Sequence, residues 1–150
     1  MSSHPYPAGY CRRASRHEHL LGVPTLLTSA ADALEVVAAA LHVPERVETI
    51  ALLLDDDRRG RTVVVVDGTE PADSLIEVVE CLCDAMSDEG GQLVVASVRP
   101  SVGLVPGDTD RWFEASAIAD DRGCTLLDWF VVRDRIACRV ADLIAEPSRW

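Results

Sequence analysis

Apolar residues recur at helical spacing in three stretches of the chain. In residues 28–45 they fall on one face, Ser29 can cap the first turn, and Pro44 ends the pattern. Residues 71–86 carry a similar stripe, and residues 108–123 end in a glycine, which suits the position just after a helix. The pattern therefore predicts three helices, each with one apolar face.

Other runs are apolar almost without interruption and predict strands. Residues 50–54 and 62–66 flank a turn of Asp, Arg and Gly, which is typical of a β-hairpin. Residues 92–98 and 124–132 predict two further strands, one before and one after the third helix. Residues 134–146 fit both a helix and an edge strand, and their periodicity does not decide between the two.

The order of these elements is helix, strand, strand, helix, strand, helix, strand. It predicts an α/β fold in which a mixed β-sheet is flanked by helices, and the nearly continuous apolar strands indicate burial on both faces. Residues 1–24 are polar and rich in Pro, Arg and His, so we expect a mobile leader. The length of 150 residues suits one domain, which we expect to span residues 25–150.

The charge of the chain limits its partners. The formal net charge is −11 at pH 7, which repels phosphate backbones and anionic lipid surfaces. We therefore expect no nucleic-acid partner and no membrane partner. Five cysteines, an odd number, without a visible signal peptide favour a reducing cytoplasm as the location.

Cysteines and aromatic residues are candidates for chemistry or binding. The four cysteines after the leader suit small core or boundary positions, and Cys81 and Cys83 point to different faces of a helix, which makes them poor partners for each other. Trp129 and Phe130 alternate along a predicted strand, so they face opposite layers. One of these two aromatic side chains is therefore a candidate for a partner-binding surface.

The loop "ASVRPSVGLVPGDTD", residues 96–110, leaves the carboxyl end of a predicted strand. Ligands of open α/β sheets bind at such ends, and loops held between rigid elements often carry function. The simplest interpretation is a turn-rich connection in which Asp108 or its neighbour caps the next helix. The spacing of the loop allows a second interpretation.

Three features between Glu48 and Val132 together follow the pattern of one family. The predicted hairpin ends in Gly68 and Thr69, and the strand "LLDWFVV" is similar to the family's "LLDHIIV". The loop has the length of the motif H-x-H-P-S-G-x-x-x-P-S-x-x-D, and four positions match it: Pro100, Ser101, Pro106 and Asp110. The sequence thus resembles the JAB/MPN (JAMM) metallopeptidase-like domains, in particular the RadC-type bacterial branch. The resemblance implies a three-layer JAB/MPN-like domain.

The chemistry of this family needs a zinc ion held by two imidazoles and a carboxylate, with an open position for water. A hairpin Glu takes the proton of that water and a loop Ser stabilises the oxyanion. The two His positions are Ser97 and Arg99 in this sequence, and neither side chain can replace an imidazole. The resemblance places the Glu in the second hairpin strand, where residues 62–66 hold no acid. Only Ser101 and Asp110 remain, so we expect the zinc to be lost.

The sequence leaves the question of catalysis open and favours a catalytically degenerate RadC-like JAB-domain protein without a cofactor. Such a pseudoenzyme would bind a protein or small-molecule partner without hydrolysis. One alternative is a metal-dependent JAB-family hydrolase with ligands not recognised here, for which His42 would have to fold over the site. Another is a self-associating structural domain. We also hypothesise that Arg99 brings a positive charge into the place of the metal and pairs with Asp110.

Overall fold

The computed structural model describes residues 26–86 and 90–150, so the leader expected in residues 1–24 lies outside the described residues. The elements are, in chain order, α2 (Ala30–Ala40), β1 (Glu48–Leu54), β2 (Gly60–Asp67), α3 (Ser74–Met86), β3 (Gly91–Val98), α4 (Asp108–Asp121), β4 (Cys124–Arg133), β5 (Ile136–Arg139) and the 3₁₀ helix η2 (Val140–Ile144). None of the helices in this part of the chain is long and apolar enough to cross a membrane.

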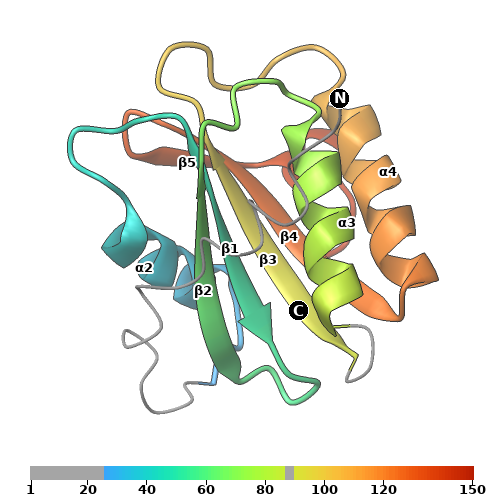
Figure 1. Ribbon diagram of the computed structural model, residues 1–150. Helices are drawn as coiled ribbons and strands as arrows, with labels where there is room; N and C mark the ends of the chain where they lie inside the picture. The colour runs from blue at the N-terminus through green and yellow to red at the C-terminus, as the bar shows by residue number, and fades with distance from the viewer. Residues whose placement is uncertain (1–25, 87–89) are drawn as a thin grey trace.

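The strands form one mixed sheet in the order β2-β1-β3-β4-β5. Strand β1 runs antiparallel to β2 and β3, β3 and β4 are parallel, and β5 is antiparallel to β4. Helices α3 and α4 lie side by side on one face, and α2 lies on the other (Figure 1). The chain therefore has the predicted α/β fold, a mixed sheet between two helical layers.

Both faces of the sheet are buried, as the apolar strands predicted. Ala51 and Trp129 belong to the core under α3 and α4, while Ile50 and Phe130 belong to the core under α2. Trp129 and Phe130 thus face opposite layers, as predicted. Both are at most 1% exposed, so the hypothesis that one of them forms a partner-binding surface is wrong. The sheet is covered on both faces, which leaves no exposed face for either ring.

The predicted first helix has the expected cap. The hydroxyl of Ser29 accepts a hydrogen bond from the amide of Asp32, which satisfies one of the free N–H groups of the first turn. The helix ends at Ala40, four residues before Pro44. The hairpin and the other two helices also lie where the apolar pattern placed them.

The C-terminal segment divides into a strand and a helix, which explains why neither period fitted all of it. Residues Ile136–Arg139 pair with β4, and the chain then continues as η2. The turn before β5 has Asp134 and Arg135 in left-handed backbone conformations, with φ of 53° and 63°. The carboxylate of Glu45 accepts hydrogen bonds from the amides of both turn residues, which helps to hold this unusual turn.

Candidate functional site

Most buried polar side chains of the described residues gather at one end of the sheet. Strand β1 begins there, β2 and β3 end there, and helices α3 and α4 begin there, near the top of Figure 1. Burying polar groups is costly unless they are bonded, so such a concentration is the first place to look for a site. The buried polar residues at this end are Glu48, Thr49, Thr69, Ser74, Ser97, Arg99 and Asp108.

Arg99, the first residue after β3, turns inward. Its side chain is 7% exposed, and Nη1 donates to Oδ2 of Asp108 at 2.8 Å and to the carbonyl of Gly103 at 3.2 Å. The guanidinium lies 5.6 Å from the centroid of the Trp129 ring, within range of a cation–π interaction. The charge of Arg99 is therefore neutralised by Asp108 and covered by Trp129, inside the protein.

Asp108, the first residue of α4, connects the loop to both helices. Oδ2 also accepts from the amide of Val105 at 2.8 Å, and Oδ1 accepts from Nη1 of Arg111 at 3.1 Å. Arg111 reaches on to Asp73, just before α3, through Nε at 2.7 Å. The hydrogen bond to Asp73, together with that to Asp108, raises the pKa of Arg111. The carboxylate of Asp108 thus organises the loop between β3 and α4.

The structure corrects the hypothesis that Arg99 pairs with Asp110. The partner is Asp108, and Asp110 is exposed. Helix α4 begins at Asp108, and residues two positions apart in a helix point in different directions, so only one of the two acids faces the loop. The N-cap is Gly107, with φ of 92°, and no side chain makes a cap hydrogen bond, so the prediction that Asp108 or its neighbour caps this helix through a side chain is wrong.

The four residues at the family's site positions, Ser97, Arg99, Ser101 and Asp110, differ in exposure. Ser97 and Arg99 are buried, whereas Ser101 and Asp110 are exposed. Ser97 accepts a hydrogen bond from the indole N–H of Trp129 at 2.9 Å. A nucleophilic serine needs a base that accepts its proton, and no such hydrogen bond joins Ser97 to a base within the described residues. The side chain of Ser97 thus acts as an acceptor in this environment.

A pair of threonines lies beside Ser97. Thr49 of β1 is directly opposite Ser97 of β3 in the sheet, and its hydroxyl donates to the hydroxyl of Thr69 at 2.8 Å. These hydroxyls lie on the face covered by α3 and α4, and they give the end of the sheet a polar but uncharged surface. Hydroxyl groups of this kind are poor zinc ligands.

A buried carboxylate missed by the sequence analysis lies on the opposite face. Glu48 is 0% exposed, and Oε1 is 2.7 Å from Nδ1 of His42. Arg46 approaches the same imidazole, with Nη2 3.0 Å from Nε2, and it also donates to Asp67 at 3.1 Å. The resemblance places the acid in the second hairpin strand, whereas Glu48 lies at the start of the first, in "VETIALLL". A single acid at the start of an apolar run was the available signal.

His42 therefore does not fold over the loop between β3 and α4. Its ring is bonded to Glu48, and strand alternation places Glu48 on the face of the sheet opposite Thr49 and Ser97. Within residues 26–86 and 90–150, no group of three or more His, Cys, Asp and Glu side chains could hold a metal ion. The residues at the motif positions also do not fit zinc, because Arg99 has no lone pair to offer a metal.

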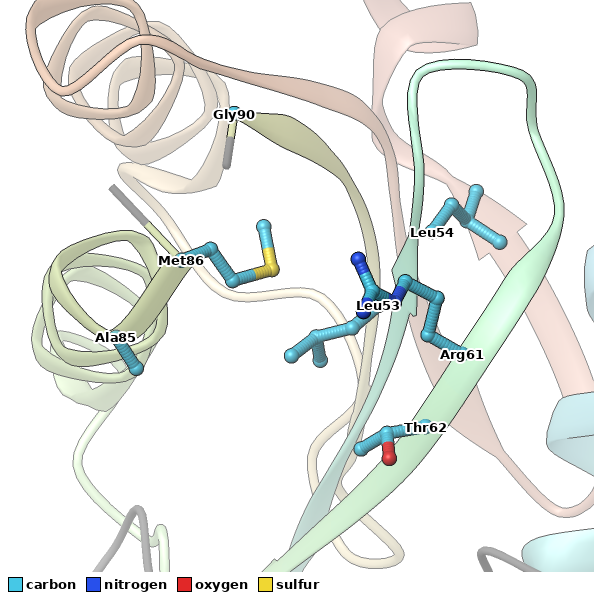
Figure 2. Close-up of a pocket in the computed structure, with 7 residues that line it drawn as sticks. All are labelled: Leu53, Leu54, Arg61, Thr62, Ala85, Met86 and Gly90. Carbon is cyan, nitrogen blue, oxygen red and sulfur yellow. The ribbon is translucent and has the colours of Figure 1, made fainter. Parts of the chain in front are cut away.

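A small pocket lies at the other end of the sheet, between the β1–β2 hairpin and the end of α3 (Figure 2). Its volume is about 200 Å³. The side chain of Met86 points from α3 towards Leu53 across this pocket. The residues that line it are Leu53, Leu54, Arg61, Thr62, Ala85, Met86 and Gly90. The pocket is thus separate from the polar end of the sheet.

Comparison with known proteins does not assign the chain to a family. No protein-family model matches the sequence, and no curated protein matches it. The function must therefore be inferred from the chain's own residues.

Proposed function

We propose that the chain is a catalytically degenerate JAB/MPN-like domain of the RadC type, which binds a partner without hydrolysis. The observation that supports this proposal is the buried ion pair of Arg99 and Asp108. The resemblance places a zinc-bound imidazole at position 99, and a guanidinium there supplies a permanent positive charge without a metal.

The environment of the ion pair supports a structural role for it. Asp108 accepts from Arg99, Arg111 and the amide of Val105, so both of its oxygens are used. The carboxylate of Asp108 is thus fully bonded within the loop and the start of α4. The pair would hold the loop in shape in place of the metal.

Exposed aliphatic side chains around this loop suggest a protein as the partner. Val102 is 56% exposed and Leu104 37% exposed on the loop, and Ile136 is 72% exposed on the neighbouring β4–β5 hairpin. The two segments adjoin, since a Cβ at Gly103 would lie 3.1 Å from Cδ of Arg133. Apolar groups that gather at a surface are typical of protein interfaces. The proposed location is the cytoplasm, which the composition of the chain favours.

The first test is the zinc content of the purified, untagged protein after exposure to excess zinc and desalting. We expect a value near zero. About one equivalent of zinc would overturn the proposal and favour the hydrolase alternative. A double variant, Ser97→His with Arg99→His, restores the motif's imidazoles and is expected to gain zinc, provided that circular dichroism shows it folded.

The second test concerns the apolar surface. Val102→Asp with Leu104→Asp places charges on the loop without touching the ion pair, and Leu143→Asp is a matched control because Leu143 is 52% exposed on η2. Sedimentation velocity of the unaltered chain addresses the self-association alternative. A monomer counts against that alternative. A dimer that only the loop variant dissociates would instead make a second copy the partner.

A further inference from the structure

Two buried thiols meet where α3 and β4 approach each other. Cys83 of α3 is 0% exposed and Cys124, the first residue of β4, is 2% exposed, and both are free. The Sγ of Cys124 lies 4.0 Å from the carbonyl oxygen of Cys83. Each thiol lies close enough to influence the pKa of the other. The fold therefore brings together two sulfur atoms that are 41 residues apart in the chain.

Two residues that line the pocket of Figure 2 are neighbours of the thiol pair in the chain or in space. Its lining residue Met86 follows Cys83 by less than one helical turn. Its lining residue Gly90 lies close to Gly123, since a Cβ at Gly90 would be 3.7 Å from the Gly123 carbonyl oxygen. Gly123 immediately precedes Cys124. A pocket of about 200 Å³ is large enough for a molecule the size of hydrogen peroxide, so a small oxidant can approach this region from solvent.

We propose that Cys83 and Cys124 form an oxidation-sensitive pair, which a two-electron oxidant of the peroxide class converts into an internal disulfide linking α3 to β4. In the first step, one sulfur, as a thiolate, attacks a peroxide oxygen, the O–O bond breaks, and a sulfenic acid and water are formed. In the second step the other sulfur attacks the sulfenic sulfur, the S–O bond breaks and a second water leaves. Each peroxide molecule thus accepts two electrons and the two thiol protons.

The surroundings of the thiols make this reaction slow at neutral pH. Burial, and then the neighbouring Cys124, raise the pKa of Cys83 to about 12, and burial also raises the pKa of Cys124. The thiolate is the reactive form, so the rate of crosslinking is expected to rise about tenfold per pH unit between roughly pH 7 and 9. The pair therefore stays reduced under mild conditions and responds to strong or prolonged oxidation.

The disulfide would tie together elements that are already tethered at the surface. Arg122, just after α4, donates to Asp84 at 2.7 Å and to Glu80 at 3.0 Å, both on α3. A covalent link beneath these ion pairs would restrict the end of α3 further. Oxidation is therefore expected to raise the melting temperature, and a reductant is expected to reverse the rise.

The test uses the unaltered full chain, from which reductant has been removed, and hydrogen peroxide as the probe. After denaturation, alkylation and digestion, mass spectrometry is expected to find a peptide pair joined through Cys83 and Cys124, lighter by two hydrogen atoms. Cys138→Ser keeps this product, because Cys138 lies outside the pair, and Cys83→Ser abolishes it. The crosslink is read in the unaltered protein, so the test does not depend on how a variant folds.

Two results would overturn the inference. In one, Cys83 and Cys124 both remain alkylatable while the half-buried Cys138 is oxidised. In the other, the new disulfide joins a different pair of cysteines. Neither result bears on the proposed JAB-like function, because the thiol pair lies away from the loop between β3 and α4.

Discussion

Two buried arginine–carboxylate pairs serve different parts of this molecule. In one, Nη1 of Arg99 lies 2.8 Å from Asp108, and in the other, Nε of Arg139 lies 2.8 Å from Asp128. The carboxylates are 3% and 0% exposed. Asp128 is in the middle of β4, and its other partner is the indole N–H of Trp150 at 2.7 Å. Asp108 instead accepts further hydrogen bonds from a second arginine, Arg111, and from the amide of Val105 in the loop.

The two pairs differ in the structural elements that they join. Asp128 joins a central strand to the edge strand β5 and to the C-terminal residues, so its loss would affect the whole sheet. Asp108 joins a loop to two helix starts, so its loss would affect mainly the loop. The Arg99–Asp108 pair therefore orders a loop, whereas the Arg139–Asp128 pair supports the sheet. Asp128→Ala and Arg99→Met test this distinction, and two smaller changes test the pairing of Asp110 and the start of α2.

The largest effect is expected for Asp128→Ala. The change leaves the guanidinium of Arg139, which is 17% exposed, without its main partner, and we expect a loss of about 3–5 kcal/mol in the free energy of unfolding. Urea denaturation followed by circular dichroism measures it. Asp128→Leu combined with Arg139→Met removes both charges and is expected to recover much of the loss. An equal loss in the double variant would contradict the account of an unpaired buried charge.

A smaller effect is expected for Arg99→Met. Asp108 keeps Arg111 and the amide of Val105, so the carboxylate stays bonded, and we expect a loss of about 2 kcal/mol. Relative to the unaltered chain, the variant should show a larger increase in amide hydrogen exchange in the loop than in the sheet. If the sheet amides exchange faster to the same extent, the pair supports the whole fold and the distinction between the two pairs fails.

Asp110→Asn is expected to change the free energy of unfolding by less than about 0.5 kcal/mol, because Asp110 is exposed. The same urea denaturation measures it, with Asp108→Asn as the matched control two residues away. A larger loss for Asp110→Asn than for Asp108→Asn would restore the pairing that the sequence suggested.

The smallest expected effect is a change in the pKa of Asp32, at the start of α2, when Thr28 is replaced by Val. Hydrogen bonds from the amide and hydroxyl of Thr28 lower the pKa of this carboxyl below its ordinary value of 3.8. The ionised form is therefore stabilised in the folded state. This stabilisation is present above that ordinary value and is lost as the pH falls through the lowered one. Thr28→Val should raise the pKa of Asp32 towards 3.8, as measured by NMR titration. An unchanged pKa would show that the hydroxyl contributes nothing.

The strands and helices could be predicted because their apolar pattern is local. The pairing of residues in the candidate site could not be predicted in the same way, because it depends on the residue at which α4 begins. Counting positions in a motif selects Asp110, whereas the helix start at Asp108 decides which acid faces Arg99. Glu48 was missed for a similar reason. Its partner His42 lies in the connection after α2, and only the folded loop brings the two together.

Residues 134–146 show a third reason why sequence patterns can fail to predict structure. A strand of four residues followed by a short 3₁₀ helix is too brief for either period to be seen. The turn before β5 also lacks the glycine or asparagine that usually marks left-handed backbone, because Asp134 and Arg135 take that conformation. Glu45, far away in the chain, accepts hydrogen bonds from the amides of this turn.

The placement of the indoles has an optical consequence. Each of the three tryptophans lies against an arginine. The distances from the guanidinium carbon to the centroid of the indole ring are 4.3 Å for Arg149 and Trp112, 5.6 Å for Arg99 and Trp129, and 5.5 Å for Arg58 and Trp150. Indole emission responds to nearby charge and to solvent, so a chain that keeps only Trp129 would carry a native fluorophore directly beside the Arg99 guanidinium. Its emission wavelength and lifetime would then report changes in the surroundings of Arg99 without any attached label.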